Sequence, residues 1–232
     1  MWHIKLQGVD ENIFKTLKTI LNDRIYKKEI EKFNITEYYL ILDKQNISSA
    51  PEALNIGEEE INILSSILKL LNIKNNISVD IPYKVNKDGT RTGYLLFSDT
   101  VHMMDELKIY SNNSLIYSTE DETNKLIQDI YSKSIVSDIK KKLLIYLGQE
   151  TNWVNAYKIY EVLKHHYLEE KELKKIPELS TFAHTANSPN VIGKDARHGI
   201  QIHKNPKKIA NLESSYNKLK ELAIQFLISE DI

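Results

Sequence analysis

At Thr119-Glu-Asp-Glu-Thr-Asn-Lys-Leu-Ile-Gln-Asp-Ile-Tyr131 the periodicity of the sequence changes, and this change decides the fold class. Thr119 is a capping residue, and the three acidic residues that follow it suit the positive end of a helix. From Leu126 to Leu143, apolar residues recur at steps of three and four, and Gly148 follows as a C-cap. A helix is therefore predicted over 119–148.

Helical spacing continues through the rest of the sequence. Large apolar residues between Trp153 and Tyr167 recur at steps of three and four, and Asn205-Pro206 is expected to start a last helix. The apolar side chains of that helix should face the core and its charged side chains should face water, namely Leu219, Leu222 and Phe226 against Lys218, Lys220 and Glu221.

The residues before 118 follow a different pattern, because apolar and polar side chains alternate or form short branched and aromatic runs. The segments Trp2–Leu6 and Thr36–Asp43 are predicted strands. Asp88-Gly89 is a turn signal between two further runs of this kind. Two β-hairpins are predicted, one joining 77–85 to 91–97 and one joining 106–110 to 114–117.

Two helices are predicted among these strands. Asp10 is a candidate N-cap for a helix whose apolar stripe ends at Leu21. Ser49 and Pro51 are typical of a helix start, but Gly57 is expected to interrupt that helix, so a helix is predicted over 58–72.

These patterns predict an α+β fold, with a strand-rich half over 1–118 and a mainly helical half over 119–232. The helical half carries a polar loop at 180–208. No stretch rich in Gly, Pro and Ser separates the halves, so two domains and the two layers of one domain both remain open.

Composition limits the classes of protein to which the chain could belong. Its 232 residues can bury a proper core, and the absence of cysteine excludes disulfides, cysteine-bound metals and a thiol nucleophile. The N-terminal residues lack the pattern of a secretory signal, and the longest apolar runs are too short to cross a bilayer. We expect a soluble cytoplasmic protein with no membrane association.

The polar loop at 180–208 is the strongest candidate for a functional site, because polar side chains between rigid elements often bind or react. It holds three of the seven histidines. Residues 184–220 contain seven Lys or Arg against two acidic residues, although the net charge of the chain is only −1. This local excess suits a phosphate-bearing partner, and it equally suits a solvated loop and helix face.

Within the loop, Arg197-His198-Gly-Ile-Gln-Ile-His203 has an arginine followed by a polar residue and, after five intervening residues, a histidine. This arrangement resembles the signature of the HEPN-domain ribonucleases. The resemblance implies that Arg197 grips phosphate, that His203 is the general acid or base, and that His198 takes the polar position of the motif. It also implies an RNA substrate and a site at the mouth of a helical bundle, generally across a homodimer.

The run Asn187-Ser-Pro-Asn-Val-Ile-Gly-Lys-Asp-Ala-Arg-His-Gly199 also resembles the C-terminal end of a group of uncharacterised bacterial proteins. A turn containing Gly193 beside a lysine can cradle an anion, and it can equally be a structural turn. The phosphate-loop signature is absent, because no glycine lies five positions before Gly193. The binding candidates are His184, Asn187, Asn190, Lys194, Asp195 and Lys204.

No metal or cofactor is predicted. The loop histidines His184, His198 and His203 lack the His-Glu-x-x-His spacing of zinc sites, and neighbouring histidines such as His165 and His166 diverge on a helix. Histidine and arginine can cleave RNA without a metal, because imidazole transfers protons near neutral pH and guanidinium binds phosphate oxygens.

Two functions are therefore carried forward. The first is a metal-independent ribonuclease of a bacterial toxin or phage-defence type, with RNA as substrate and a protein partner in a multi-component system. The second is a noncatalytic module that binds protein or nucleic acid and whose loop at 180–208 is structural. Catalysis requires Arg197 and His203 to be exposed and convergent, whereas a structural role expects Arg197 to be held by Asp195, Asn187 or loop carbonyls.

Overall fold

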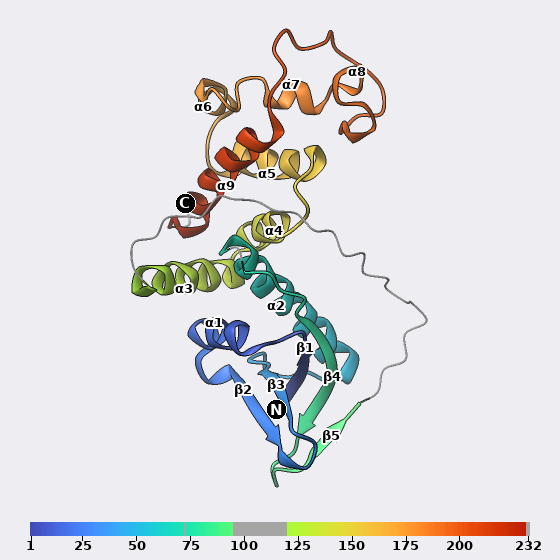
Figure 1. Ribbon diagram of the computed structural model, residues 1–232, viewed down its shortest axis with the longest axis vertical. Coiled ribbons are helices and arrows are strands. Elements are labelled where there is room, and N and C mark those ends of the chain that lie inside the picture. Colours follow the sequence, from blue (N-terminus) through green and yellow to red (C-terminus); the bar gives the residue numbers. More distant parts are fainter. Residues whose placement is uncertain (72, 95–119, 231–232) are drawn as a thin grey trace. The chain divides into compact units, whose positions relative to one another are not determined.

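The computed structural model describes residues 1–71, 73–94 and 120–230. The predicted α+β class is confirmed (Figure 1). All strands of the described residues lie between Trp2 and Gly93, and the described residues after 119 are mainly helical. The predicted hairpin of 106–110 and 114–117 lies outside the described residues.

The N-terminal part contains a five-stranded antiparallel sheet in the order β2-β3-β1-β4-β5. The predicted first strand, the strand near 36–43 and the first hairpin are present, and the hairpin turns through Asn86 to Thr90. The second arm of that hairpin is a strand over Arg91–Gly93, and its predicted residues 95–97 lie outside the described residues. The strands are β1 (Trp2–Gln7), β2 (Ile25–Ile30), β3 (Ile35–Ile41), β4 (Ser78–Val85) and β5 (Arg91–Gly93).

Two helices, α1 (Glu11–Leu21) and α2 (Ala50–Leu70), pack against this sheet. Asp10 caps α1 as predicted, since its Oδ1 accepts a hydrogen bond from the backbone N–H of Ile13 at 2.7 Å. Ser49 caps α2, accepting from the N–H of Glu52 at 3.3 Å.

The predicted break at Gly57 and the helix over 58–72 were wrong, because α2 runs without interruption from Ala50 to Leu70. Gly57 is buried where α2 crosses β1, and a Cβ atom there would lie 2.9 Å from Cγ1 of Ile4. The glycine therefore permits close packing of helix on sheet and does not end the helix.

Strand β2 was not predicted. Its sequence, Ile-Tyr-Lys-Lys-Glu-Ile, has three consecutive charged residues and little alternation. It lies at the edge of the sheet and pairs only with β3 among the described strands. Lysines on an edge strand are common because they discourage pairing with another chain. The same charged residues interrupt the alternation of apolar and polar residues by which a strand is predicted from sequence.

The prediction of one continuous helix over 119–148 was wrong. The structure has two helices there, α3 (Glu120–Val136) and α4 (Asp138–Leu147). Ser137 separates them in an extended conformation (φ −122°, ψ 111°), and its side chain caps α4 at the N–H of Lys140. A serine competes for backbone hydrogen bonds in this way and favours helix ends over interiors. Gly148 is the C-cap of α4, as predicted.

The C-terminal helices surround a core to which α4, α5 and α9 contribute. Their buried side chains include Leu143, Ile159, Leu163, Leu219 and Leu227, none of which is measurably exposed. The helices after α4 are α5 (Trp153–His166), α6 (Glu170–Lys175), α7 (Phe182–Ala186), α8 (Pro189–Ile192) and α9 (Leu212–Ile228).

The last helix begins later than predicted. Asn205-Pro206 is not its start, because α9 begins at Leu212 with Asn211 as N-cap, whose Oδ1 accepts from the N–H of Ser214 at 2.9 Å. Pro206 is buried in the preceding loop. The expected apolar face of α9 is confirmed. Lys220 departs from its expected exposure, because it is half-buried and the loss of hydration lowers the pKa of its ammonium group.

The chain divides into two compact units, Met1–Gln128 and Asp129–Ile232, and the division falls inside α3. The division of the chain into halves at 1–118 and 119–232 stays a prediction. No helix in the described ranges is both long enough and apolar enough to cross a membrane.

Candidate functional site

The segment at 180–208 belongs to the C-terminal unit Asp129–Ile232, called here the helical unit, and hydrogen bonds among the segment's own residues hold its shape. The N–H of Arg197 donates to the carbonyl oxygen of Ala186 at 2.9 Å, and Nε2 of His184 bonds the carbonyl oxygen of Lys204 at 2.7 Å. Just beyond the segment, the N–H of Ala210 donates to the hydroxyl of Thr185 at 3.0 Å. The loop therefore has a defined conformation, although about half of its residues are exposed.

The guanidinium group of Arg197 is directed onto helix α5. One of its nitrogens lies 3.1 Å from a carboxylate oxygen of Glu161, and its central carbon lies 4.4 Å from the centre of the Tyr157 ring. If Arg197 were structural, Asp195 or Asn187 was expected to hold its side chain. The ion-pair partner in the structure is Glu161 instead. A guanidinium that stacks on an aromatic ring while pairing with a carboxylate is well suited to anchoring a loop.

Arg197→Ala should therefore lower the free energy of unfolding by about 1–2 kcal/mol, because it removes a cation–π contact and a partly exposed ion pair. Arg197→Lys should restore only part of this loss, since an ammonium group lacks the planar stacking surface. Glu161→Gln is the matched control that removes the ion pair alone. Urea denaturation of the three variants measures the effect, and an unchanged midpoint for Arg197→Ala would contradict the anchoring role.

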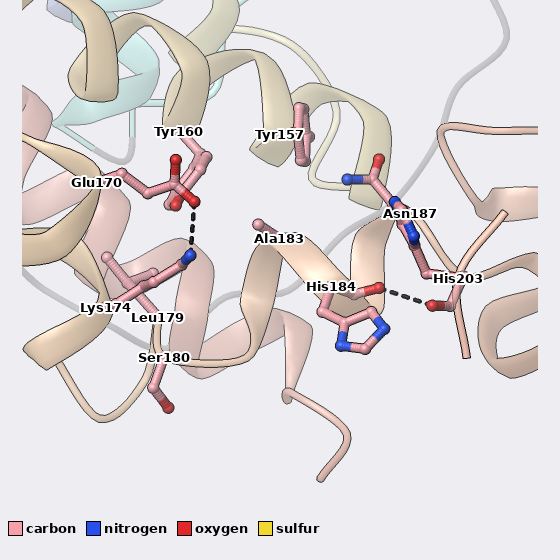
Figure 2. Close-up of a pocket in the computed structure, with 11 residues that line it drawn as sticks. Tyr157, Tyr160, Glu170, Lys174, Leu179, Ser180, Ala183, His184, Asn187 and His203 are labelled. Atoms are coloured by element: carbon pink, nitrogen blue, oxygen red, sulfur yellow. Dashed lines mark hydrogen bonds and ion pairs between the residues drawn. The ribbon is translucent and has the colours of Figure 1, made fainter. Parts of the chain in front are cut away.

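A pocket of about 520 Å³ lies beside the loop (Figure 2). In that view Tyr160, Glu170, Lys174 and Ser180 lie on one side of the pocket, and His184, Asn187 and His203 lie on the other. The pocket is lined by Tyr157, Tyr160, Glu170, Lys174, Leu179, Ser180, Ala183, His184, Asn187, Ser188 and His203.

Two of the lining residues carry a buried side-chain oxygen with no hydrogen-bond partner: the hydroxyl of Tyr160 and Oδ1 of Asn187. Tyr160 is only 1% exposed. Burial, together with the negative charge of Glu170, raises the pKa of its hydroxyl to about 12, so the group stays neutral at physiological pH. It can then both donate and accept a hydrogen bond.

Glu170 lies between two lysines at one side of the pocket. Its two carboxylate oxygens lie 2.6 Å from Nζ of Lys164 and 2.7 Å from Nζ of Lys174. These hydrogen bonds and charges lower the pKa of the Glu170 carboxyl to about 2, with Lys164 as the larger cause. The carboxylate therefore stays ionised, and two lysines accompany the single negative charge.

Two histidines, His184 and His203, also line the pocket. The carbonyl oxygen of Lys204 can only accept a hydrogen bond, so Nε2 of His184 carries the hydrogen. In the neutral ring this leaves Nδ1 as an acceptor. His203 is positioned through its backbone, because Nε2 of Gln201 donates to its carbonyl oxygen while Oε1 of Gln201 accepts from the N–H of Asn190 at 3.2 Å.

The structure brings together only part of the predicted set. His184, Asn187 and His203 line the pocket, whereas Arg197 contacts Tyr157 on α5 and is not among the lining residues. The remaining candidates lie outside the pocket lining, namely His198, Asn190, Lys194, Asp195 and Lys204. Gly193 adopts a left-handed conformation (φ 64°) in the turn that was considered as an anion cradle.

Sequence reasoning missed the half of the pocket that comes from the helices. Tyr157 and Tyr160 are three residues apart on α5 and were assigned to its apolar stripe, while Glu170 and Lys174 belong to the short helix α6, which had no prediction. Their helical spacing, three and four residues, was the only available signal, and it is also the spacing of core residues and surface ion pairs.

The described ranges contain no group of three His, Asp or Glu side chains that could hold a metal ion. The pocket offers proton donors and acceptors, one carboxylate and accompanying lysines, which suit the binding of a polar, anionic ligand or proton transfer. Comparison with protein-family models, curated proteins and solved structures finds no match to the chain.

Proposed function

We propose that the helical unit is a noncatalytic module that binds RNA through the loop at 180–208. The observation that carries the proposal is a set of exposed lysines on the loop that have no ion pair among the described residues, namely Lys194, Lys204, Lys207 and Lys208. Unpaired cations on one segment favour a partner with many phosphates, because binding releases the counterions of the nucleic acid. A chain without cysteine suits the cytoplasm, where RNA is available.

The position of Arg197 favours binding over cleavage. A catalytic arginine must offer its guanidinium to the phosphate, but this one already pairs with Glu161 and covers the Tyr157 ring. An RNA phosphate would have to displace a carboxylate that lies on the same unit. Arg197 therefore supports the loop, and the lysines supply the charge for the partner.

RNA cleavage is the second candidate function, favoured by the presence of His184 and His203 in one pocket. One histidine would take the proton of the ribose 2′-hydroxyl, and the 2′-oxygen would attack phosphorus. The bond from phosphorus to the 5′-oxygen would then break as the other histidine protonates that oxygen. A lysine would balance the charge that grows on the phosphate.

RNA binding is tested by removing two loop lysines together. Lys207→Ala/Lys208→Ala should weaken binding of a short fluorescein-labelled single-stranded RNA roughly tenfold or more at low salt. The slope of log affinity against log salt should become shallower by about 1.4, since each phosphate contact on a single strand contributes about 0.7. Fluorescence anisotropy at several salt concentrations measures both quantities.

The matched control is Lys171→Ala/Lys175→Ala, which removes the same charge from α6 of the same unit. These lysines already pair with Glu169 and Glu172, at 2.7 and 2.9 Å, so their loss should change affinity much less. If wild-type protein binds no RNA at low salt, the proposal fails. The exposed side chains of Ile200, Ile202 and Ile209 would then direct the search towards a protein partner.

A further inference from the structure

A second pocket of the helical unit, of about 320 Å³, lies where α4 packs against α5. Helix α4 contributes Lys142 and Tyr146, which are four residues apart. Helix α5 contributes residues at steps of three and four, which place side chains on one face of a helix. They include Lys158, Glu161, Val162 and His165. Each of these residues keeps part of its surface exposed, so a ligand can reach it.

Two lysines of this pocket carry charge that no acidic side chain balances. Neither Lys142 nor Lys158 has an ion pair among the described residues. Their ammonium groups lie 5.9 and 5.4 Å from the centre of the Tyr146 ring, so one ring gathers both lysines. Nζ of Lys158 also donates to the side-chain oxygen of Asn155 at 3.2 Å. Asn155 is neutral, and an ammonium group has two further N–H groups to donate.

The acidic residue of the lining is Glu161, and its charge is already paired. One of its carboxylate oxygens lies 3.1 Å from a guanidinium nitrogen of Arg197. The loop at 180–208 therefore reaches this pocket through Arg197. Because Arg197 balances the carboxylate, the positive charge of the two lysines remains, and the pocket favours an anionic ligand.

The arrangement of the donors favours a phosphate monoester over an internal phosphate of a nucleic acid. A monoester has close to two negative charges near neutral pH and three free oxygens, all of which accept hydrogen bonds. Lysines from two helices and the imidazole of His165 can donate to several of these oxygens. The end of a strand can also enter a recess that a continuous backbone has to cross. Tyr146 and Val162 add an aromatic ring and an apolar side chain, which suit the attached nucleoside.

We propose that this pocket binds a phosphate monoester, the group found at the end of an RNA strand, through Lys142, Lys158 and His165. The inference rests on the proposed RNA binding and extends it, because Arg197 connects the RNA-binding loop to Glu161 at the pocket. The same group is present in a free nucleotide, and the test separates these two sources.

The test compares three single-stranded RNAs of one sequence, each with an internal fluorescein label. One has a 5′-phosphate, one has a 3′-phosphate, and one has hydroxyl groups at both ends. Fluorescence anisotropy with the full chain at low salt measures their affinities. A phosphate at one end or the other should tighten binding about tenfold relative to the hydroxyl-ended RNA, which is the usual gain from hydrogen bonds to a charged group.

Three double variants assign this preference to the pocket. Lys142→Gln/Lys158→Gln should bind phosphate-ended and hydroxyl-ended RNA with equal affinity, whereas Lys142→Arg/Lys158→Arg keeps the charge and should keep the preference. The matched control is Lys171→Gln/Lys175→Gln on α6, where both lysines are paired with glutamates, and it should also keep the preference. The melting temperature of the first variant should change little, because both lysines are at the surface.

A second measurement, isothermal titration calorimetry with AMP, presents the same group outside RNA. Equal affinity of the three RNAs, with no AMP binding that depends on Lys142 and Lys158, overturns the inference and leaves RNA binding by the loop lysines intact. A preference that survives Lys142→Gln/Lys158→Gln also overturns it. Lysine-dependent binding of AMP in a protein that binds no RNA overturns the proposed RNA function alone and assigns the pocket to a free nucleotide. If AMP abolishes the preference for phosphate-ended RNA, both ligands use this pocket.

Discussion

Phe182→Ala is expected to lower the free energy of unfolding of the helical unit by about 3–5 kcal/mol, the usual cost of truncating a buried phenylalanine. Phe182 on α7 is completely buried. Its ring lies 5.6 to 6.4 Å from the ring centres of Trp153, Tyr157 and Tyr160, so its removal leaves a cavity beneath three aromatic side chains of α5. Urea denaturation followed by circular dichroism measures the loss.

The control for this substitution is Val154→Ala on α5, because Val154 is 38% exposed. Its cost should be well under that of Phe182→Ala. A loss below about 1 kcal/mol for Phe182→Ala would mean that the aromatic cluster is not a packed core. Phe182 also packs against two lining residues of the pocket, Tyr157 and Tyr160.

The elements predicted from the sequence are those in which one local signal agrees with the tertiary environment. Strand β1 alternates because Trp2, Ile4 and Leu6 are its buried apolar residues, and α2 contacts the strand. Asp10 caps α1 through its own side chain. The errors arose where a distant contact decides the outcome. Gly57 stays helical because α2 packs closely on Ile4, which is more than fifty residues earlier in the chain. No pattern around Gly57 reports that contact.

The candidate site also depends on contacts between residues that are distant in the sequence, which local patterns do not reveal. The polar composition of 180–208 located the loop, and three of its predicted residues do line the pocket. The role assigned to Arg197 depends on Glu161 and Tyr157, which lie 36 and 40 positions earlier in the sequence. The unpaired hydroxyl of Tyr160 follows from the packing of α5, and a tyrosine in an apolar stripe gives no sign of it.

The second candidate function leads to the other large expected effect. If the protein cleaves RNA, His184→Ala and His203→Ala should each lower the rate roughly 10²-fold or more, because general acid–base catalysis typically contributes 10² to 10⁴. EDTA should have little effect on such a reaction. His198→Ala should be milder, since His198 does not line the pocket. The assay follows cleavage of labelled single-stranded RNA with and without the chelator.

The Arg197→Ala variant distinguishes between two possible sites of RNA cleavage. A site built on the Arg197 to His203 motif predicts that Arg197→Ala abolishes cleavage without changing stability. A site built on His184 and His203 predicts that Arg197→Ala mainly lowers the melting temperature, because its guanidinium is engaged by Glu161 and Tyr157. His166→Ala on α5, which removes a histidine outside this pocket, is the matched control and should retain the full rate. Intact RNA after incubation with wild-type protein would exclude both sites and leave RNA binding as the function to test.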